Sequence, residues 1–357
     1  MSRSINIYPT ENSKISQVDF NNIPFGQVFS DHMFVADYIN GEWQNAEIKE
    51  LAPFMVHPGN LAWHYGQSIF EGMKATATAD GTPLLMRPEK HIERLNASAS
   101  RMCMPNFPEE LFLEAIDKLV WLDRAWIPKE KGSALYIRPL MIAMDDALGV
   151  RPSETYKLLI FTLPVGPYYD KPVSLLAEDT YVRAAQGGVG EAKTAGNYAA
   201  SLQPAKIAKV KGYDQIMWMD AKEFKYIQEV GTMNIFFVID GKVVTPRLSG
   251  TILKGITRDS VIHILKSEGY EVIEKDLHID EVVDAHKNGT LQEIFGTGTA
   301  AVVANVHKFA YENHDYDVDV DTYKISPFLK KYIEELRAGE REDKFGWIKM
   351  LGAEVLA

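Results

Sequence analysis

Two short turn signals most constrain the fold of this chain. The pairs Asn40-Gly41 and Asp240-Gly241 each stand between apolar runs, in FVADYINGEW and in NIFFVIDGKVV. Both pairs are favoured in two-residue hairpin turns, because their residues readily adopt the positive φ angles that such turns require. The sequence therefore predicts antiparallel strands in each half of the chain.

Segments with helical periodicity accompany these strands. In the first half, residues 90–102 place Ile92 and Leu95 on one helical face. The segment Glu109–Leu122 forms a second such face from Phe112, Ile116, Leu119 and Val120. In the second half, expected strands over 215–220 and 225–230 precede two helices that close near Gly269 and Gly289. The predicted fold class is α/β, of the α+β kind.

The length of 357 residues predicts about two domains, since a typical domain has roughly 150 residues. The cluster PVGPYYDKP, residues 164–172, interrupts the periodic pattern and is typical of a connection between domains. We expect a small α/β domain over 1–165, a linker over 166–177, and a large domain over 178–357.

The charge balance argues against two classes of partner. Thirty-eight basic and 49 acidic residues give a net charge of −11, which disfavours nucleic acid and anionic membrane surfaces as partners. No apolar run approaches the roughly 18 residues of a membrane span. The acidic stretch over 314–323 lacks the glycine and terminal glutamate of a calcium loop, and we expect no metal site.

The cell compartment is predicted from the N-terminus and from cysteine usage. The segment MSRSINIYPTENSK has no apolar core and contains an acidic residue, so it does not match a secretory or transit peptide. The single cysteine, Cys103, cannot form an internal disulfide, which fits a reducing compartment. We therefore expect a cytoplasmic protein in which Cys103 is a small buried apolar residue.

Four segments of the second half carry the residues with chemical potential. They are GGVGEAKTAGNYAASL (187–202), QEVGTMNIF (228–236), LKGITRDS (253–260) and EIFGTGTA (293–300). The first differs from a nucleotide-binding phosphate loop, because Ala192 replaces the required second glycine and no strongly apolar strand precedes it. Lys193 is left in a glycine-rich setting that allows the backbone to approach a planar ligand closely.

The other segments suit a phosphate group. LKGITRDS leads into a helix, whose N-terminal N–H groups and positive dipole end attract anions. The threonine-rich turn in FGTGTA adds hydroxyl and amide donors. Local donors of this kind reconcile phosphate binding with a negative net charge.

These segments resemble the branched-chain amino acid aminotransferases of the fold-type IV pyridoxal-phosphate family. The first half adds FGQVFSDHMF, HYGQSIFEGMKA, MRPEKHIERLNASASRM and ALYIRP, so the resemblance covers nearly the whole chain. It implies a homodimer, pyridoxal 5'-phosphate as cofactor, and a small α/β domain followed by a large pseudo-barrel domain with the cofactor between them. Some family members carry a Cys-x-x-Cys pair where this chain has Ala301 and Ala304, so a thiol switch is not expected there.

The resemblance also implies the cofactor residues. Lys193 corresponds to the Schiff-base lysine, whose amine can both bind the cofactor aldehyde and move the substrate proton. Glu229 resembles the carboxylate that pairs with the pyridine nitrogen, and Tyr198 the tyrosine that contacts the ring oxygen. The residues that match the family's phosphate ligands are Arg94, Ile256, Thr257 and Thr299. Arg183 matches a retained position without an assigned role.

The substrate pocket is implied in the same way. Tyr136 and Arg138, with the Thr299-Ala300 turn, match positions around the α-carboxylate. The residues at positions around the substrate side chain are Phe25, Tyr65, Phe70 and Tyr136. Because one methylene changes discrimination by only about 1 to 3 kcal/mol, we expect leucine, isoleucine and valine all to be used.

The predicted activity is reversible amino transfer between L-leucine, L-isoleucine or L-valine and 2-oxoglutarate, with a biosynthetic role implied by the family. Alternatives within the same fold are a D-amino acid or amine transaminase and an aminodeoxychorismate lyase, but EGMKA and YIRP favour the branched-chain enzyme. A phosphate-loop hydrolase is disfavoured by Ala192. A non-catalytic binding protein is disfavoured by the joint presence of Lys193, Glu229 and Arg94.

Overall fold

The computed structural model describes residues 4–167 and 171–356. Residues 168–170 of the predicted linker lie outside this range. The chain divides into two compact units: unit 1 comprises Met1–Tyr168, Ala192–Ala195 and Glu334–Ala357, and unit 2 comprises Tyr169–Glu191 and Gly196–Ile333. The predicted domain bounds differ from these units at 192–195 and at 334–357, and they stay a prediction.

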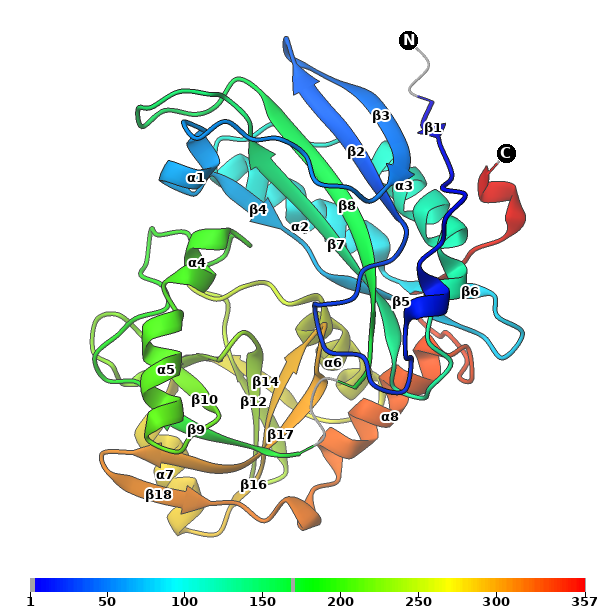
Figure 1. Cartoon of the computed structure of the whole chain (residues 1–357). Helices are drawn as coiled ribbons and strands as arrows, with labels where there is room; N and C mark the ends of the chain where they lie inside the picture. The colour runs from blue at the N-terminus through cyan, green and yellow to red at the C-terminus, as the bar shows by residue number, and fades with distance from the viewer. Residues whose placement is uncertain (1–3, 168–170, 357) are drawn as a thin grey trace. The chain divides into compact units, whose positions relative to one another are not determined.

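Unit 1 is built on a nine-stranded mixed sheet (Figure 1). Its strands, in their order across the sheet, are β1 (Asn6–Ile7), β3 (Glu42–Glu50), β2 (His32–Ile39), β8 (Tyr156–Val165), β7 (Ala134–Ala143), β5 (Met73–Ala77), β6 (Pro83–Met86) and β19 (Ile348–Met350), with β4 (Ser68–Phe70) paired to β7. Its helices are η1 (Ile15–Gln17), α1 (Leu61–Tyr65), α2 (Pro88–Arg101), α3 (Glu109–Leu122), η2 (Arg124–Trp126) and η4 (Ala353–Leu356).

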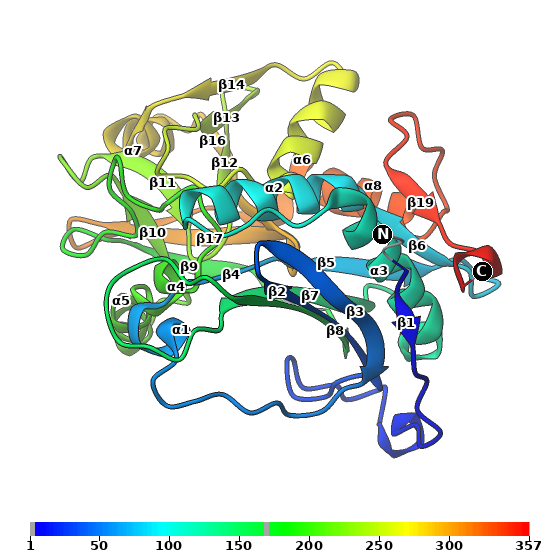
Figure 2. The same ribbon diagram turned by 90° about the horizontal axis from the view of Figure 1, so that it is seen from above.

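Helices α2 and α3 lie beside the sheet of unit 1 (Figure 2), and their apolar residues form its core together with residues of the strands. Helix α3 has the predicted bounds, and its four predicted core residues are fully buried. They pack with alternate residues of β7, such as Leu135 and Ile137, on one face of the sheet. Because side chains alternate along a strand, Tyr136 and Arg138 point to the opposite face, away from the two helices.

Unit 2 contains a ten-stranded mixed sheet. Its strands, in order, are β14 (Val272–Lys275), β13 (Lys242–Pro246), β12 (Asn234–Ile239), β16 (Leu291–Gly298), β17 (Val302–Tyr311), β9 (Val173–Ala177), β10 (Gln215–Met219), β11 (Tyr226–Val230) and β15 (Leu277–His278), with β18 (His314–Asp317) paired to β17. The remaining helices are α4 (Ala195–Ala199), α5 (Leu202–Val210), α6 (Ile256–Ser267), α7 (Ile279–Lys287), η3 (Val320–Thr322) and α8 (Ile325–Arg337). Within the described parts of the chain, no helix has the length and apolar character needed to cross a membrane.

Both predicted hairpins are confirmed. Strands β2 and β3 pair antiparallel around Asn40 (φ 55°) and Gly41 (φ 82°). Strands β12 and β13 do so around Asp240 (φ 51°) and Gly241 (φ 74°). Positive φ at both central residues gives a turn whose twist matches that of the flanking strands.

The expectation that Cys103 is buried is wrong. This residue is exposed and adopts a left-handed backbone conformation, φ 54°, two residues after the last residue of α2. A left-handed residue commonly ends a helix by reversing the chain direction. The helical pattern of residues 90–102 predicted the helix but not the conformation of the residue that follows it.

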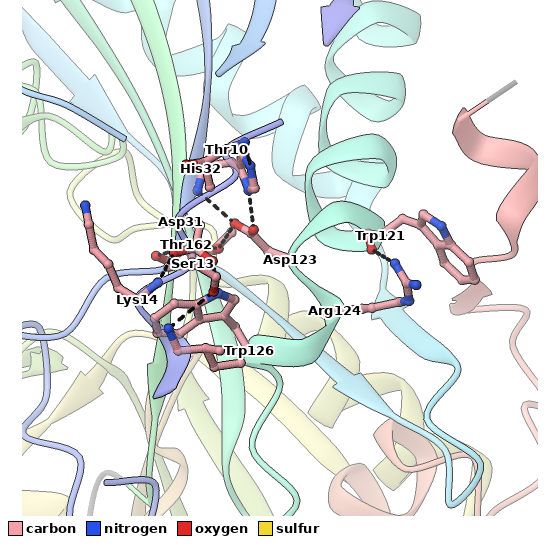
Figure 3. A network of polar contacts seen from close by, with 12 residues as sticks. Thr10, Ser13, Lys14, Asp31, His32, Trp121, Asp123, Arg124, Trp126 and Thr162 are labelled. Atoms are coloured by element: carbon pink, nitrogen blue, oxygen red, sulfur yellow. Dashed lines mark hydrogen bonds and ion pairs between the residues drawn. The ribbon is translucent and has the colours of Figure 1, made fainter. Parts of the chain in front are cut away.

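A polar network fastens the segment before β2 to unit 1 (Figure 3). The buried Asp31 carboxylate accepts hydrogen bonds from Ser13 Oγ at 2.6 Å, from the Lys14 N–H at 2.9 Å and from the Trp126 indole N–H at 2.8 Å. These donors come from the N-terminal segment and from η2, so Asp31 joins three parts of the chain.

His32 makes a second connection in the same network. Its Nε2 accepts a hydrogen bond from the Thr10 N–H at 2.9 Å, and its Nδ1 lies 2.6 Å from Asp123 Oδ1. Because Nε2 is the acceptor, Nδ1 carries the proton and donates it to Asp123. Asp31 and His32 together hold residues 10–14 in place.

The Asp31 contacts predict a pH-dependent stability. Burial alone would raise the pKa of Asp31, but the hydrogen bonds from Lys14, Ser13 and Trp126 hold it below its usual 3.8. A carboxyl group with a lowered pKa in the folded state contributes stability above its unfolded-state pKa and loses that contribution as pH falls. Asp31→Asn should therefore lower the free energy of unfolding by about 1 to 3 kcal/mol at neutral pH.

The difference between Asp31→Asn and the unaltered chain should shrink as pH falls below 3.8. Urea unfolding followed by tryptophan fluorescence, at a series of pH values, measures it. Asp19→Asn, at an exposed position of the same segment, is the control and should unfold like the unaltered chain. A difference that stays constant at every pH would contradict the assignment.

Candidate active site

The main chain of Lys193 is held on both sides within unit 1. Its carbonyl oxygen accepts a hydrogen bond from the Phe70 N–H at 3.0 Å, and its N–H donates to Ser98 Oγ at 2.9 Å. The next residue, Thr194, forms an antiparallel bridge with Ile69. The segment carrying Lys193 therefore continues the pairing of β4 and is fastened to α2.

The side chain of Lys193 is half-buried, and its Nζ lies 4.8 Å from the centroid of the Phe70 ring. Phe70 thus contacts the lysine through both its N–H and its ring. The amine belongs to a fixed backbone beside an aromatic surface, an arrangement that limits the positions Nζ can reach.

Arg94 is directed by a buried carboxylate. Its Nε and Nη2 donate to the two oxygens of Glu71 at 2.7 and 2.8 Å, and His91 Nδ1 lies 2.8 Å from the same carboxylate. Burial alone would raise the pKa of Glu71, but Arg94 and His91 outweigh it and hold that pKa well below its usual value. Burial lowers the pKa of His91, so the imidazole is neutral at pH 7 and donates to Glu71.

This bidentate pairing fixes the plane of the Arg94 guanidinium. Its assignment to the cofactor phosphate stays a prediction. Sequence reasoning placed Glu71 in a family motif but gave it no function, because only the fold brings β4 and α2 together.

Four of the predicted substrate residues form one cluster in unit 1. Arg138 Nη2 donates to the Tyr136 hydroxyl at 3.2 Å, and the guanidinium lies 4.8 Å from the Phe70 ring centroid. Phe25 packs edge-on against Tyr136 with centroids 6.0 Å apart. A Cβ at Gly72 would lie 1.9 Å from the Tyr136 hydroxyl, so only glycine leaves room for that ring.

Two further observations concern these residues. Arg138 Nε is buried and has no hydrogen-bond partner among the described residues. A buried guanidinium N–H that lacks an acceptor is suited to donate to an anionic ligand. Tyr65 is placed differently, because its hydroxyl accepts a hydrogen bond from the Gly149 N–H at 2.9 Å and its ring is exposed.

In unit 2, Glu229 on β11 is a buried carboxylate that accepts several hydrogen bonds. Oε1 accepts hydrogen bonds from the Leu253 N–H at 3.1 Å and from Asn234 Nδ2 at 3.2 Å. Oε2 forms an ion pair with Arg183 Nε. Arg183 Nη2 in turn donates to the carbonyl oxygens of Gly190, at 2.8 Å, and Thr251, at 2.6 Å. Arg183 thus supplies the positive charge that a carboxylate with 3% exposure requires.

A small pocket, partly open to solvent, lies beside this carboxylate. Glu229, Arg183 and the half-buried Tyr198 all line it. The remaining lining residues are Asn197, Ser201, Gly231, Thr232 and Leu253. Two predicted cofactor residues, Tyr198 and Glu229, therefore face one cavity of unit 2.

The predicted phosphate ligands of unit 2 lie at the start of a helix and in a turn between two strands. Ile256 and Thr257 are the first residues of α6, which begins after Gly255 without a side-chain cap. The first N–H groups of such a helix have no partner within the helix and favour an anion. Thr299 and Ala300 lie between β16 and β17.

In unit 2, the Glu229 carboxylate suits a basic nitrogen and the start of α6 suits a phosphate, and in unit 1 Lys193 offers an amine. The family model for amino-transferase class IV matches residues 68–309, and the chain belongs to this family. Within it, the chain groups with the branched-chain-amino-acid aminotransferases, as the relatives below show.

Two relatives come from Bacillus subtilis. Branched-chain-amino-acid transaminase 1 is 50% identical over 92% of this chain and 94% of its own length. Branched-chain-amino-acid aminotransferase 2 is 47% identical over 96% of this chain and 95% of its own. Among solved structures, the T.th. branched-chain amino acid aminotransferase complexed with N-(5'-phosphopyridoxyl)-L-glutamate has a TM-score of 0.72 and 28% identity, over 88% of this chain and 97% of that one.

These findings confirm the predicted family, the α+β fold-type IV class and the identification as a branched-chain aminotransferase. They do not favour the other enzymes of the same fold. The roles of individual residues stay predictions. Ser98 and Asn234 were missed, because a buried serine or asparagine has no sequence pattern of its own and depends on partners that are distant along the chain.

The Arg183–Glu229 pair predicts a strong energetic coupling in unit 2. Arg183→Leu leaves a buried carboxylate without its cation and should lower the free energy of unfolding by about 3 to 5 kcal/mol. In the double variant Arg183→Leu/Glu229→Gln the loss should be smaller than the sum of the two single losses. Urea unfolding of the four chains measures this.

The control is Arg247→Leu, which removes an exposed ion pair with Asp276 in the same unit. Its effect on the free energy of unfolding should be small, because solvent screens an exposed ion pair. Strictly additive losses for Arg183 and Glu229 would contradict the buried pairing.

Proposed function

We propose that this chain transfers an amino group reversibly between L-leucine, L-isoleucine or L-valine and 2-oxoglutarate, with pyridoxal 5'-phosphate as cofactor, in amino-acid biosynthesis. The observation that carries the proposal is the fixed Lys193 of a class IV aminotransferase, held between β4 and α2. The T.th. relative, whose bound adduct joins this type of cofactor to glutamate, supports both the cofactor and one substrate.

The residues present fit the cofactor at each of its polar groups. The Glu229 carboxylate, which forms an ion pair with Arg183, suits a protonated ring nitrogen, because carboxylate oxygens are hydrogen-bond acceptors. The uncapped start of α6 suits a phosphate, as do Arg94 and Thr299. Tyr198 is assigned to the ring oxygen. When bound, the cofactor supplies an electron sink for the negative charge that develops at the substrate Cα.

Lys193 performs two tasks in this proposal. Its amine would hold the cofactor covalently, and its Nζ, once free, would take the proton from the substrate Cα. The hydrogen bonds of its main chain to Phe70 and Ser98 hold the backbone that carries Nζ.

The unit 1 cluster supplies substrate recognition. Arg138 Nε and the Tyr136 hydroxyl are assigned to the α-carboxylate, together with the Thr299-Ala300 turn. The rings of Phe25, Phe70 and Tyr136, with Tyr65, are assigned to the alkyl side chain. Since the three branched-chain amino acids offer only alkyl surface, all three should react.

A homodimer completes the proposal. Unit 1 exposes several large apolar side chains, which are Phe54, Met55, Trp63, Leu148 and Val150. Exposed apolar side chains of this size, with Met55 at 97% exposure, suit contact with a second copy. A cytoplasmic location is proposed from the single cysteine, and the net charge of −11 opposes a role with nucleic acid.

The central test of function is turnover. The unaltered chain, supplied with pyridoxal 5'-phosphate, should form glutamate from 2-oxoglutarate with L-leucine, L-isoleucine and L-valine. Lys193→Arg keeps the charge but cannot perform the amine chemistry, so the rate should fall by at least about a thousandfold. Lys222→Arg, at an exposed position, is the control and should retain full activity.

Two outcomes would count against the proposal. Full activity of Lys193→Arg would remove its chemical basis. Comparable rates with D-amino acids or with simple amines would favour the other enzymes of this fold.

Ser98 should affect the reaction through Lys193 alone. Ser98→Ala leaves the Lys193 N–H without its acceptor, so the free energy of unfolding should fall by about 1 to 3 kcal/mol and kcat should fall with little change in KM. Ser100→Ala, an exposed position on the same helix, is the matched control. If both variants behave identically in steady-state kinetics, Ser98 does not position the lysine.

A further inference from the structure

Asn234 connects two parts of unit 2 that the proposed function assigns to opposite ends of the cofactor. It is the first residue of β12 and is 5% exposed. Its Nδ2 donates to Glu229 Oε1 at 3.2 Å and to the Leu253 carbonyl oxygen at 3.0 Å. The Leu253 N–H donates to the same Oε1 at 3.1 Å. The carboxylate, the amide and the segment leading into α6 therefore form one bonded group.

The other side of the Asn234 amide meets the start of α6. A Cβ at Gly255 would lie 1.9 Å from Asn234 Oδ1. The backbone of Gly255, φ −65° and ψ 126°, is open to any residue, so it is the space beside Asn234 that requires glycine here. Gly255 directly precedes Ile256 and Thr257, the predicted phosphate ligands.

The orientation of the amide follows from its partners. Glu229 Oε1 and the Leu253 carbonyl oxygen are both acceptors, so the NH₂ group must face them. Oδ1 then faces Gly255. Asn234 thus acts as a spacer with its donor end on Glu229 and its acceptor end against Gly255, the residue that precedes α6.

We propose that Asn234 is a positioning residue that fixes the separation between the Glu229 carboxylate and the N-terminus of α6. This inference rests on the proposed function, in which Glu229 meets the ring nitrogen of pyridoxal 5'-phosphate and α6 meets its phosphate. When two protein groups that contact the same ligand are already held in place, binding that ligand does not cost the free energy of ordering them. Without Asn234, only the Leu253 N–H still joins the Glu229 carboxylate to the segment before α6, and the space beside Gly255 is no longer filled.

The consequence is specific to ligands that use both ends. The apo chain binds pyridoxal 5'-phosphate through ring and phosphate, whereas pyridoxal lacks the phosphate. The ratio of the dissociation constants of pyridoxal and pyridoxal 5'-phosphate therefore measures what the phosphate end adds to ring binding. Asn234→Ala should lower this ratio by about tenfold or more, which corresponds to about 1.4 kcal/mol of lost coupling.

The experiment titrates apo chain with each compound and follows absorbance. Asn234→Asp is the second variant, because it keeps the volume and the oxygen beside Gly255 but replaces the donor with a second acceptor next to Glu229. It should also lower the ratio. Gly255→Ala should do so in the unaltered background and should add little in the Asn234→Ala background, since the two residues act through one contact.

Asn60→Ala is the matched control. Asn60 is also buried, donates from Nδ2 to the Ala143 carbonyl oxygen at 3.1 Å and accepts from the Ala62 N–H at 2.9 Å, but it lies in unit 1. A general loss of stability, monitored by thermal unfolding, weakens both ligands equally and leaves the ratio unchanged. The ratio should stay unchanged for Asn60→Ala.

The outcomes separate the two proposals. If the unaltered chain binds neither compound, the proposed function fails and this inference fails with it. If the unaltered chain binds pyridoxal 5'-phosphate but Asn234→Ala and Asn234→Asp keep the unaltered ratio, Asn234 is structural only and the proposed function stands.

Discussion

The interaction on which the account depends is the fixing of the Lys193 main chain by hydrogen bonds from Phe70 and to Ser98. A lysine side chain is long and flexible, so its amine is useful only where the backbone that carries it is held. In this chain the holding elements are β4 and α2, which belong to the same unit. The sheet and helices of unit 1 matter for function because they place those two partners on either side of one short segment.

The buried carboxylates are held in place in a similar way. Glu71 is paired with Arg94 in unit 1, and Glu229 with Arg183 in unit 2, each supported by further hydrogen bonds. Isolated carboxylates in these positions would be protonated or destabilising. With their partners they remain anions of fixed direction, one orienting a guanidinium and the other presenting an acceptor to a cavity. A chain with net charge −11 can in this way offer positive charge locally, where an anionic group requires it.

The patterns that sequence predicted well are local in origin. Helix α3 has its predicted bounds because its apolar residues recur with helical spacing and pack on one face of the sheet. Both hairpins follow from the positive φ angles that Asn-Gly and Asp-Gly favour. Cys103 shows where local reasoning failed, since this residue, two positions after the end of α2, turns outward in a left-handed conformation. Partners such as Ser98 for Lys193, or Asn234 for Glu229 and Gly255, depend on which strands and helices meet. The resemblance to the family predicted residues such as Lys193 and Glu229, and the fold showed which residues hold them in place.

The most direct measurement is chemical trapping of the cofactor followed by peptide mapping. The purified chain is incubated with pyridoxal 5'-phosphate, reduced with borohydride, digested and analysed by mass spectrometry. The account predicts one phosphopyridoxyl group per chain, on Lys193, and loss of this label when L-leucine is added before reduction. A label confined to another lysine, or none at all, would contradict the account.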